Sequence, residues 1–240
     1  MRKILIIGAG KSSSYLIKYL LDKSQSENLQ ITIGDLNVEN AKKLVSDHTD
    51  VNIIHLDVFD SNSRTEAVKN ADIVISMLPA RFHIEVAKDC ITYKKHMVTA
   101  SYVSKEMEAL DDDAKANNLV FMNEIGVDPG IDHMSAMQVI DRIRDNGGKM
   151  ILFESFTGGL VAPESDDNLW NYKFTWNPRN VVVAGQGGAA KFLQEKQFKY
   201  IPYGRLFRRT EFLDIDGYGR FEAYANRDSL KYQHVYGLDH

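Results

Sequence analysis

Cysteine is almost absent from this chain of 240 residues, and several other features are missing with it. Cys90 is the single cysteine, so an intrachain disulfide and a zinc–cysteine cluster are both excluded. No apolar run approaches the roughly 18–20 residues that span a bilayer. The opening apolar segment, residues 4–7, meets glycine too soon for a signal peptide. We therefore expect a cytoplasmic protein with no membrane span and no metal site.

An excess of positive charge is also lacking. The formal net charge is −4, whereas a nucleic-acid partner is held by clustered Lys and Arg. We predict no nucleic-acid partner. A hydrophobic content of 44% suits a folded globule, and 240 residues allow one large domain or two modest ones.

Short apolar runs alternate with helical patterns along the first half of the chain. Runs of this length that end in glycine or proline are typical of buried parallel strands. The alternation predicts an α/β fold, a Rossmann-like doubly wound parallel sheet. We expect strands at residues 4–7, 30–34, 53–58, 73–78, 96–100 and 120–125, and helices at 15–21, 38–46, 64–68, 83–93 and 131–144.

The pattern changes after Gly148. Residues 151–156 predict a strand, and a near alternation of aromatic residues in 170–176 favours a core or interface strand. We predict a dinucleotide-binding domain at 1–130 and an incomplete α+β substrate-binding and dimerisation domain at 131–240. The chain ends without an element that completes a domain, which favours a truncated version of a longer protein.

A glycine-rich turn after the first predicted strand carries the cofactor prediction. The sequence Gly8-Ala9-Gly10-Lys11-Ser12-Ser13 matches the dinucleotide fingerprint, with serine in place of its third glycine. Gly8 permits the tight turn, Gly10 permits a close approach of the pyrophosphate, and the helix N-terminus supplies donors. The predicted cofactor contacts are Gly8, Gly10, Lys11, Ser12, Ser13, Asp35, Asp57, Ser76, Leu78 and Pro79.

Asp35 ends the second predicted strand, where an acid accepts hydrogen bonds from the ribose hydroxyls. A carboxylate there repels a 2′-phosphate, which favours NAD(H) over NADP(H). Asp57 has two equal interpretations, a contact to adenine or a simple helix cap. Ser76 to Pro79 end the fourth strand, at the sheet edge where the nicotinamide half is expected.

The most specific segment is Asn-Glu-Ile-Gly-Val-Asp-Pro-Gly-Ile-Asp-His at residues 123–133. It closely resembles the corresponding segment of glutamate-forming saccharopine dehydrogenase, a family also called saccharopine reductase. Further segments resemble the family in the same order and cover essentially the whole chain. They are residues 98–103, 158–165, 172–176 and 226–229.

The resemblance implies an oxidoreductase of lysine metabolism that moves a hydride between a nicotinamide and the carbon of a secondary amine. It places Ser101, Tyr102, Asp128 and Arg227 against the substrate, an amino acid with several carboxylates. Arginine offers a fixed fork to a carboxylate, and aspartate pairs with an ammonium group. Tyr102 and Asp128 would also handle the proton. A homodimer is expected.

Alternatives stay open on the sequence alone. Fungal members of the family carry an arginine near the end of the second strand and use NADP(H), whereas Asp35 indicates NAD(H). A carboxyspermidine-type dehydrogenase would share the architecture and imine chemistry. A dinucleotide-binding module without catalysis is the third possibility. His133, which follows Asp132, is more simply structural than catalytic.

Overall fold

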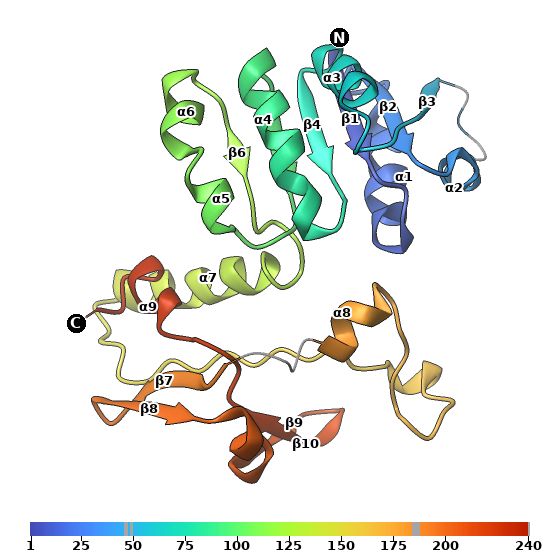
Figure 1. The fold of residues 1–240 in the computed structure, drawn as a ribbon. Coiled ribbons are helices and arrows are strands. Elements are labelled where there is room, and N and C mark those ends of the chain that lie inside the picture. The colour runs from blue at the N-terminus through green and yellow to red at the C-terminus, as the bar shows by residue number, and fades with distance from the viewer. Residues whose placement is uncertain (46–47, 49, 184–187, 240) are drawn as a thin grey trace. The chain divides into compact units, whose positions relative to one another are not determined.

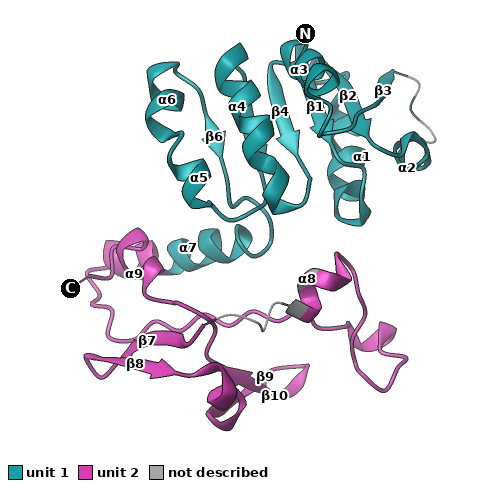
Figure 2. Ribbon diagram, viewed as in Figure 1, with its two compact units in different colours: residues 1–139 teal, residues 140–240 magenta. Residues whose placement is uncertain are grey.

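The computed structural model describes every residue except 46–47, 49, 184–187 and 240. The chain divides into two compact units, Met1–Val139 and Ile140–His240 (Figure 2). The predicted domain boundary at residue 130 stays a prediction. None of the helices in the described part of the chain is both long and apolar enough to cross a membrane.

The first unit is built on one parallel sheet of six strands in the order β3-β2-β1-β4-β5-β6 (Figure 1). The predicted Rossmann-like fold is confirmed. Because the order reverses between β1 and β4, a crevice is expected where their carboxyl ends diverge. The strands are β1 (Arg2–Ile7), β2 (Leu29–Asp35), β3 (Val51–His55), β4 (Ile73–Ser76), β5 (His96–Thr99) and β6 (Phe121–Met122).

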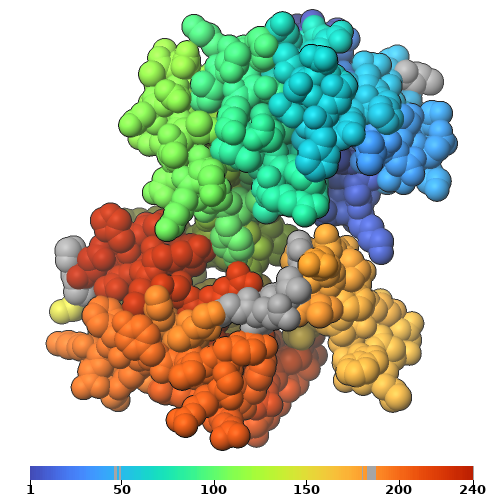
Figure 3. All heavy atoms as spheres, in the orientation of Figure 1, coloured from blue at the N-terminus to red at the C-terminus, as the bar shows by residue number. Residues whose placement is uncertain are grey.

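Helices cover both faces of this sheet, and the alternation of β1 explains why. Ile4 and Ile6 pack into one cluster with residues of α1 (Ser14–Lys23) and α2 (Val38–Leu44). Leu5 and Ile7 point to the other face and pack with residues of α3 (Ser61–Lys69) and α4 (His83–Tyr93). In the space-filling view, the cyan and green side chains of α3 and α4 cover this second face (Figure 3). Both faces are therefore buried, as a parallel sheet requires.

Local differences from the sequence prediction lie at strand ends. The third strand stops at His55, because the Asp57 carboxylate accepts the Phe59 N–H (2.9 Å) and turns the chain. The sixth strand keeps only Phe121 and Met122. Two short helices were not predicted, α5 (Lys105–Glu108) and α6 (Asp111–Ala116). The predicted helix at 131–144 is α7 (Ile131–Asp145).

The second unit contains two antiparallel hairpins, a different architecture from the first. β7 (Ala190–Gln194) pairs with β8 (Gln197–Ile201), and β9 (Thr210–Ile215) pairs with β10 (Gly219–Tyr224). Two short helices accompany them, α8 (Pro178–Val183) and α9 (Lys231–Val235).

Two predictions for this half of the chain are wrong. Residues 151–156, all of them described, form no strand. The aromatic segment also forms no strand, and Trp170 is 87% exposed. Within the described part of the chain, no strand pairs with this segment to bury one face of its alternating large side chains.

Candidate active site

The glycine-rich turn has the shape that a pyrophosphate requires. Gly8 has φ +105°, and a Cβ there would lie 3.0 Å from the Met77 carbonyl oxygen, so only glycine fits the approach of this loop to β4. At Gly10 a Cβ would meet nothing within 4 Å, so the loop faces open space. Ser13 is buried, and its hydroxyl donates to the Gly10 carbonyl at 2.8 Å. Serine thus takes the place of the third glycine while fastening the turn.

Asp35 connects this turn to the end of β2. Its Oδ2 accepts the Ala9 N–H at 2.6 Å, and its Oδ1 accepts the Asn37 N–H at 2.7 Å. The carboxylate therefore holds the glycine-rich turn against the strand. Each oxygen keeps a second lone pair, so the group can still accept a hydroxyl hydrogen bond.

A pocket of about 240 Å³ opens beside Asp35. It contains two carboxylates, and among the described residues that line it none is Lys or Arg. Phe59 and Phe82 meet edge to face, with ring centroids 4.9 Å apart. The lining residues are Ile7, Gly8, Gly34, Asp35, Leu36, Leu56, Asp57, Val58, Phe59, Leu78 and Phe82.

This pocket brings together four predicted cofactor residues, Gly8, Asp35, Asp57 and Leu78. A larger pocket of about 370 Å³ adjoins α3 and the strands β1 to β3, and contains no predicted site residue among those lining it. Its residues carry no part of the fingerprint. The smaller pocket is therefore the better candidate for the adenosine half of a dinucleotide.

A buried histidine that was not among the predicted site residues connects three residues at or just past strand ends. His83 is 4% exposed. Its Nδ1 lies 2.8 Å from the Ser76 hydroxyl, and its Nε2 lies 2.7 Å from the Ser101 hydroxyl and 3.2 Å from that of Thr99. Burial lowers the pKa of His83 from 6.5 to about 4. The imidazole is thus neutral, with one N–H to donate and one nitrogen to accept.

The His83 contacts locate Ser76 more closely than the sequence did. The Ser76 side chain is fully buried against His83, so any contact from Ser76 to a cofactor would come from its backbone. The same imidazole orients Ser101, a predicted substrate contact at the end of β5.

Tyr102 and Asp128 lie in direct contact, as a shared role would require. The Tyr102 hydroxyl donates to Asp128 Oδ1 at 2.7 Å, and both side chains are exposed. Asp128 lies on a tight loop in which the Gly126 N–H donates to the Pro129 carbonyl at 2.8 Å. The N–H of Gly130 is accepted by Asp132, at 2.6 Å.

Glu124 and His133 tie this loop to its neighbours. Glu124 Oε2 lies 3.2 Å from His133 Nε2, and Glu124 Oε1 accepts the Val103 N–H at 3.0 Å. Both side chains are about one-fifth exposed. The pair holds the segment after β5 beside the start of α7, which agrees with a structural role for His133.

Arg227, the fourth predicted substrate contact, belongs to the second unit. Its side chain is exposed, and its carbonyl accepts the Lys191 N–H at 2.6 Å. Lys191 also lies 3.2 Å from the Asp228 carboxylate. The segment 226–229 is therefore fixed along β7, with Arg227 held at the end of that strand.

Comparison with known proteins gives consistent matches over the whole chain. Residues 4–122 match the family model described as the saccharopine dehydrogenase NADP binding domain. Residues 126–240 match the saccharopine dehydrogenase C-terminal domain.

Individual relatives agree with these two matches. The chain is 38% identical to "Saccharopine dehydrogenase [NADP(+), L-glutamate-forming]" of Pyricularia oryzae, over 99% of this chain and 52% of that protein. It is 37% identical to "Alpha-aminoadipic semialdehyde synthase" of Arabidopsis thaliana, over 91% of this chain and 21% of that protein.

A solved structure of apo saccharopine dehydrogenase (L-Glu forming) from Saccharomyces cerevisiae superposes with a TM-score of 0.89 and 32% identity, over 100% of this chain and 53% of that one. The chain thus spans about half the length of the fungal proteins it matches. The relatives give no support to the carboxyspermidine-type or non-catalytic alternatives. On the fold, the glycine-rich turn and these matches, the chain belongs to the saccharopine dehydrogenase family and carries its dinucleotide-binding domain.

Proposed function

We propose that the chain provides the cofactor site and part of the substrate site of an oxidoreductase of lysine metabolism. The reaction would interconvert saccharopine with L-glutamate and 2-aminoadipate 6-semialdehyde. The observation that carries the proposal is the 2.7 Å hydrogen bond between Tyr102 and Asp128, beside a Ser101 that is held by His83. These are the predicted substrate contacts of the first unit. The names of the fungal relatives support the reaction.

The residues present fit a dinucleotide. Gly8 and Gly10 leave room for the pyrophosphate, and the pocket beside Asp35 would hold the adenosine half. Lys11 and Ser12 open the helical turn that follows, and Leu78 and Pro79 extend the edge past β4. When bound, the nicotinamide donates or accepts the hydride. The chain then has to hold the reactants in the correct relative positions. Such positioning lowers the activation barrier by about 7–11 kcal/mol in favourable cases.

Tyr102 and Asp128 have the chemistry to bind an amine and to move its proton. The Asp128 carboxylate attracts a substrate ammonium, and the Tyr102 hydroxyl can pass a proton to or from the nitrogen. Their mutual hydrogen bond fixes the direction of the phenol hydrogen in the absence of substrate. Ser101 would accept or donate at a second polar group of the substrate, and Arg227 would pair with a carboxylate.

For the cofactor we propose NAD(H), although the family model and the fungal relatives are named for NADP. Two carboxylates, Asp35 and Asp57, line the adenosine pocket, and Leu36 follows Asp35 where a cation would serve a 2′-phosphate. Titration of the chain with NADH and with NADPH, followed by nicotinamide fluorescence, tests the choice. Tighter binding of NADPH would refute it.

Turnover is tested by absorbance at 340 nm with saccharopine and either oxidised cofactor. The fungal relatives are about twice as long, so cofactor binding is measured separately from turnover. Asp128→Asn should abolish NADH production while leaving NADH binding unchanged. Asp112→Asn, an exposed aspartate on α6, is the matched control and should match the parent. An active Asp128→Asn variant would contradict the assigned role.

A homodimer and a cytoplasmic location belong to the same proposal. The second unit has many exposed large apolar side chains, among them Ile151 (93%) and Trp170 (87%), and such side chains are enriched at protein interfaces. Sedimentation analysis of the purified chain decides the oligomeric state, and a monomer at all concentrations would refute the dimer.

A further inference from the structure

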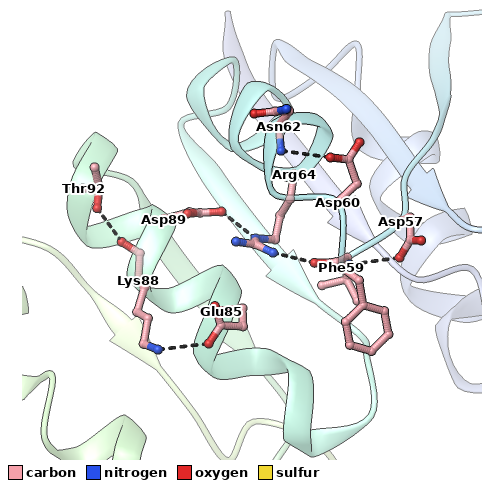
Figure 4. Close-up of polar contacts among 10 residues, drawn as sticks. Asp57, Phe59, Asp60, Asn62, Arg64, Glu85, Lys88, Asp89 and Thr92 are labelled. Atoms are coloured by element: carbon pink, nitrogen blue, oxygen red, sulfur yellow. Dashed lines mark hydrogen bonds and ion pairs between the residues drawn. The ribbon is translucent and has the colours of Figure 1, made fainter.

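Arg64 is a buried cation that the proposed reaction does not use. It lies on α3, is 7% exposed, and faces the segment between β3 and α3. Its Nε donates to Asp89 Oδ2 at 2.6 Å, and its Nη1 donates to the Val58 carbonyl at 2.5 Å. Figure 4 shows the guanidinium between Asp89, on α4, and the segment that carries Asp57, Phe59 and Asp60.

That segment is one wall of the adenosine pocket. Asp57, Val58 and Phe59 all line the pocket, together with Gly8, Gly34 and Asp35. The segment has local hydrogen bonds of its own, from the Phe59 N–H to Asp57 Oδ1 (2.9 Å) and from the Asp60 N–H to the Asp57 carbonyl (3.0 Å). Arg64 connects this segment to Asp89 on α4 through side-chain hydrogen bonds. The edge-to-face pair of Phe59 and Phe82 closes the wall beside it.

A buried ion pair adds little to the stability of a fold, because the cost of desolvating the two charges offsets most of their attraction. Apolar side chains of similar volume would fill the same space. What they lack is a donor for the Val58 carbonyl. The planar guanidinium can bind a carboxylate and a carbonyl at fixed angles, which an ammonium on a flexible stem does less well. The arrangement is therefore suited to holding a backbone position.

We propose that Arg64 and Asp89 form a positioning pair, in which Asp89 fixes the guanidinium and Arg64 fixes the Val58 carbonyl, so that residues 57–59 keep the shape that binds the adenosine half of the cofactor. Neither residue lines the pocket itself. The inference rests on the proposed location of the cofactor in this pocket.

The test measures binding of NADH and of ADP-ribose, which is the same dinucleotide without its nicotinamide ring, to the full chain. Arg64→Met removes both hydrogen bonds at similar volume, and Asp89→Ala removes the anchor of the guanidinium without changing α3. Each variant should weaken both ligands by the same factor, about 10-fold or more. Arg64→Lys keeps the positive charge but lacks the planar guanidinium with its paired donors, so this variant should bind both ligands as weakly as Arg64→Met. Glu85→Gln, which breaks the exposed Glu85–Lys88 pair on α4, should bind within about twofold of the parent.

Circular dichroism confirms that each variant is folded. If Arg64→Met does not fold, Asp89→Ala decides. Folded variants that bind both ligands like the parent would overturn the positioning role while leaving the cofactor site intact. Weakening of NADH alone, with ADP-ribose unaffected, would also overturn it, because the pair would then act on the nicotinamide side. A parent chain that binds neither ligand would overturn the cofactor site and the inference together.

Discussion

Acidification from pH 7 to pH 4.5 is expected to destabilise the first unit through His83. The imidazole is buried between Ser76, Thr99 and Ser101, and desolvation lowers its pKa from 6.5 to about 4. The folded protein therefore resists protonation of a side chain that the unfolded chain protonates readily. Stability from this source is complete above about pH 6.5 and is lost as the pH falls toward 4.

The size of the effect follows from the two pKa values. A shift of one pKa unit corresponds to about 1.4 kcal/mol, so the full effect is about 3 kcal/mol. Between pH 7 and pH 4.5 about 2 kcal/mol of this would be lost, because His83 begins to titrate in the folded state near the lower value. Below pH 4 both states carry the proton, and His83 contributes no further change.

Urea unfolding at pH 7 and pH 4.5 measures the effect in the parent and in His83→Gln, whose amide can keep one hydroxyl contact but does not titrate. Carboxylates also titrate in this range, so the informative quantity is the difference between the two proteins. The parent should lose about 2 kcal/mol more than the variant. His55→Gln, at an exposed position on β3, is the matched control and should behave like the parent. Equal pH dependence in parent and His83→Gln, or an NMR titration of His83 near 6.5, would refute the reasoning.

Three further predictions concern single residues. Burial raises the pKa of the Cys90 thiol to about 12, so a thiol reagent at pH 8 should react only with urea-unfolded protein, and fast labelling of the native chain would contradict this. Gly130→Ala should cost about 3 kcal/mol or more in unfolding free energy, since φ is +152° and a Cβ would overlap the Gly126 carbonyl; Gly204→Ala, in open space, is the control. Tyr102→Phe should lower turnover of saccharopine about 100-fold or more with little change in Tm, because the side chain is 45% exposed. A Tyr102→Phe variant of normal turnover would remove the phenol from the mechanism.

The parallel sheet could be predicted because its strands carry a strong signal. Residues 4–7 are all apolar and all buried, and they end in a glycine that no larger residue could replace. The position of Tyr102 beside Asp128 could not be derived from spacing, since 26 residues separate them and only the resemblance grouped them. His83 was missed for a related reason. Its partners lie 7, 16 and 18 residues away, and only the packing of α4 on the sheet assembles them.

The second half of the chain was predicted poorly because its turn signals are weak. β7 and β8 are joined at Glu195 and Lys196, which both have positive φ (52° and 60°). The two loop residues of such a hairpin are usually Asn-Gly or Asp-Gly, and these dipeptides predict the turn from the sequence. Two long charged residues in the loop do not predict it. Alternating aromatics gave a false signal instead. Alternation predicts a strand only where a partner strand covers one face.

Asp35 has a structural role in the glycine-rich turn and a proposed role in the choice of cofactor. One substitution can separate these two roles. Its oxygens accept the Ala9 and Asn37 N–H groups, so removal of the side chain would loosen the glycine-rich turn and weaken every dinucleotide. Asp35→Asn keeps the shape and one acceptor but loses the charge. If repulsion by the carboxylate sets the proposed preference for NADH, this variant should bind NADPH about 10-fold more tightly while NADH changes less. If hydrogen bonding to the ribose sets it, NADH should weaken while NADPH stays unchanged. Equal weakening of both would assign Asp35 to holding the turn, and the choice of cofactor would then rest on other residues of the pocket lining, such as Asp57 and Leu36.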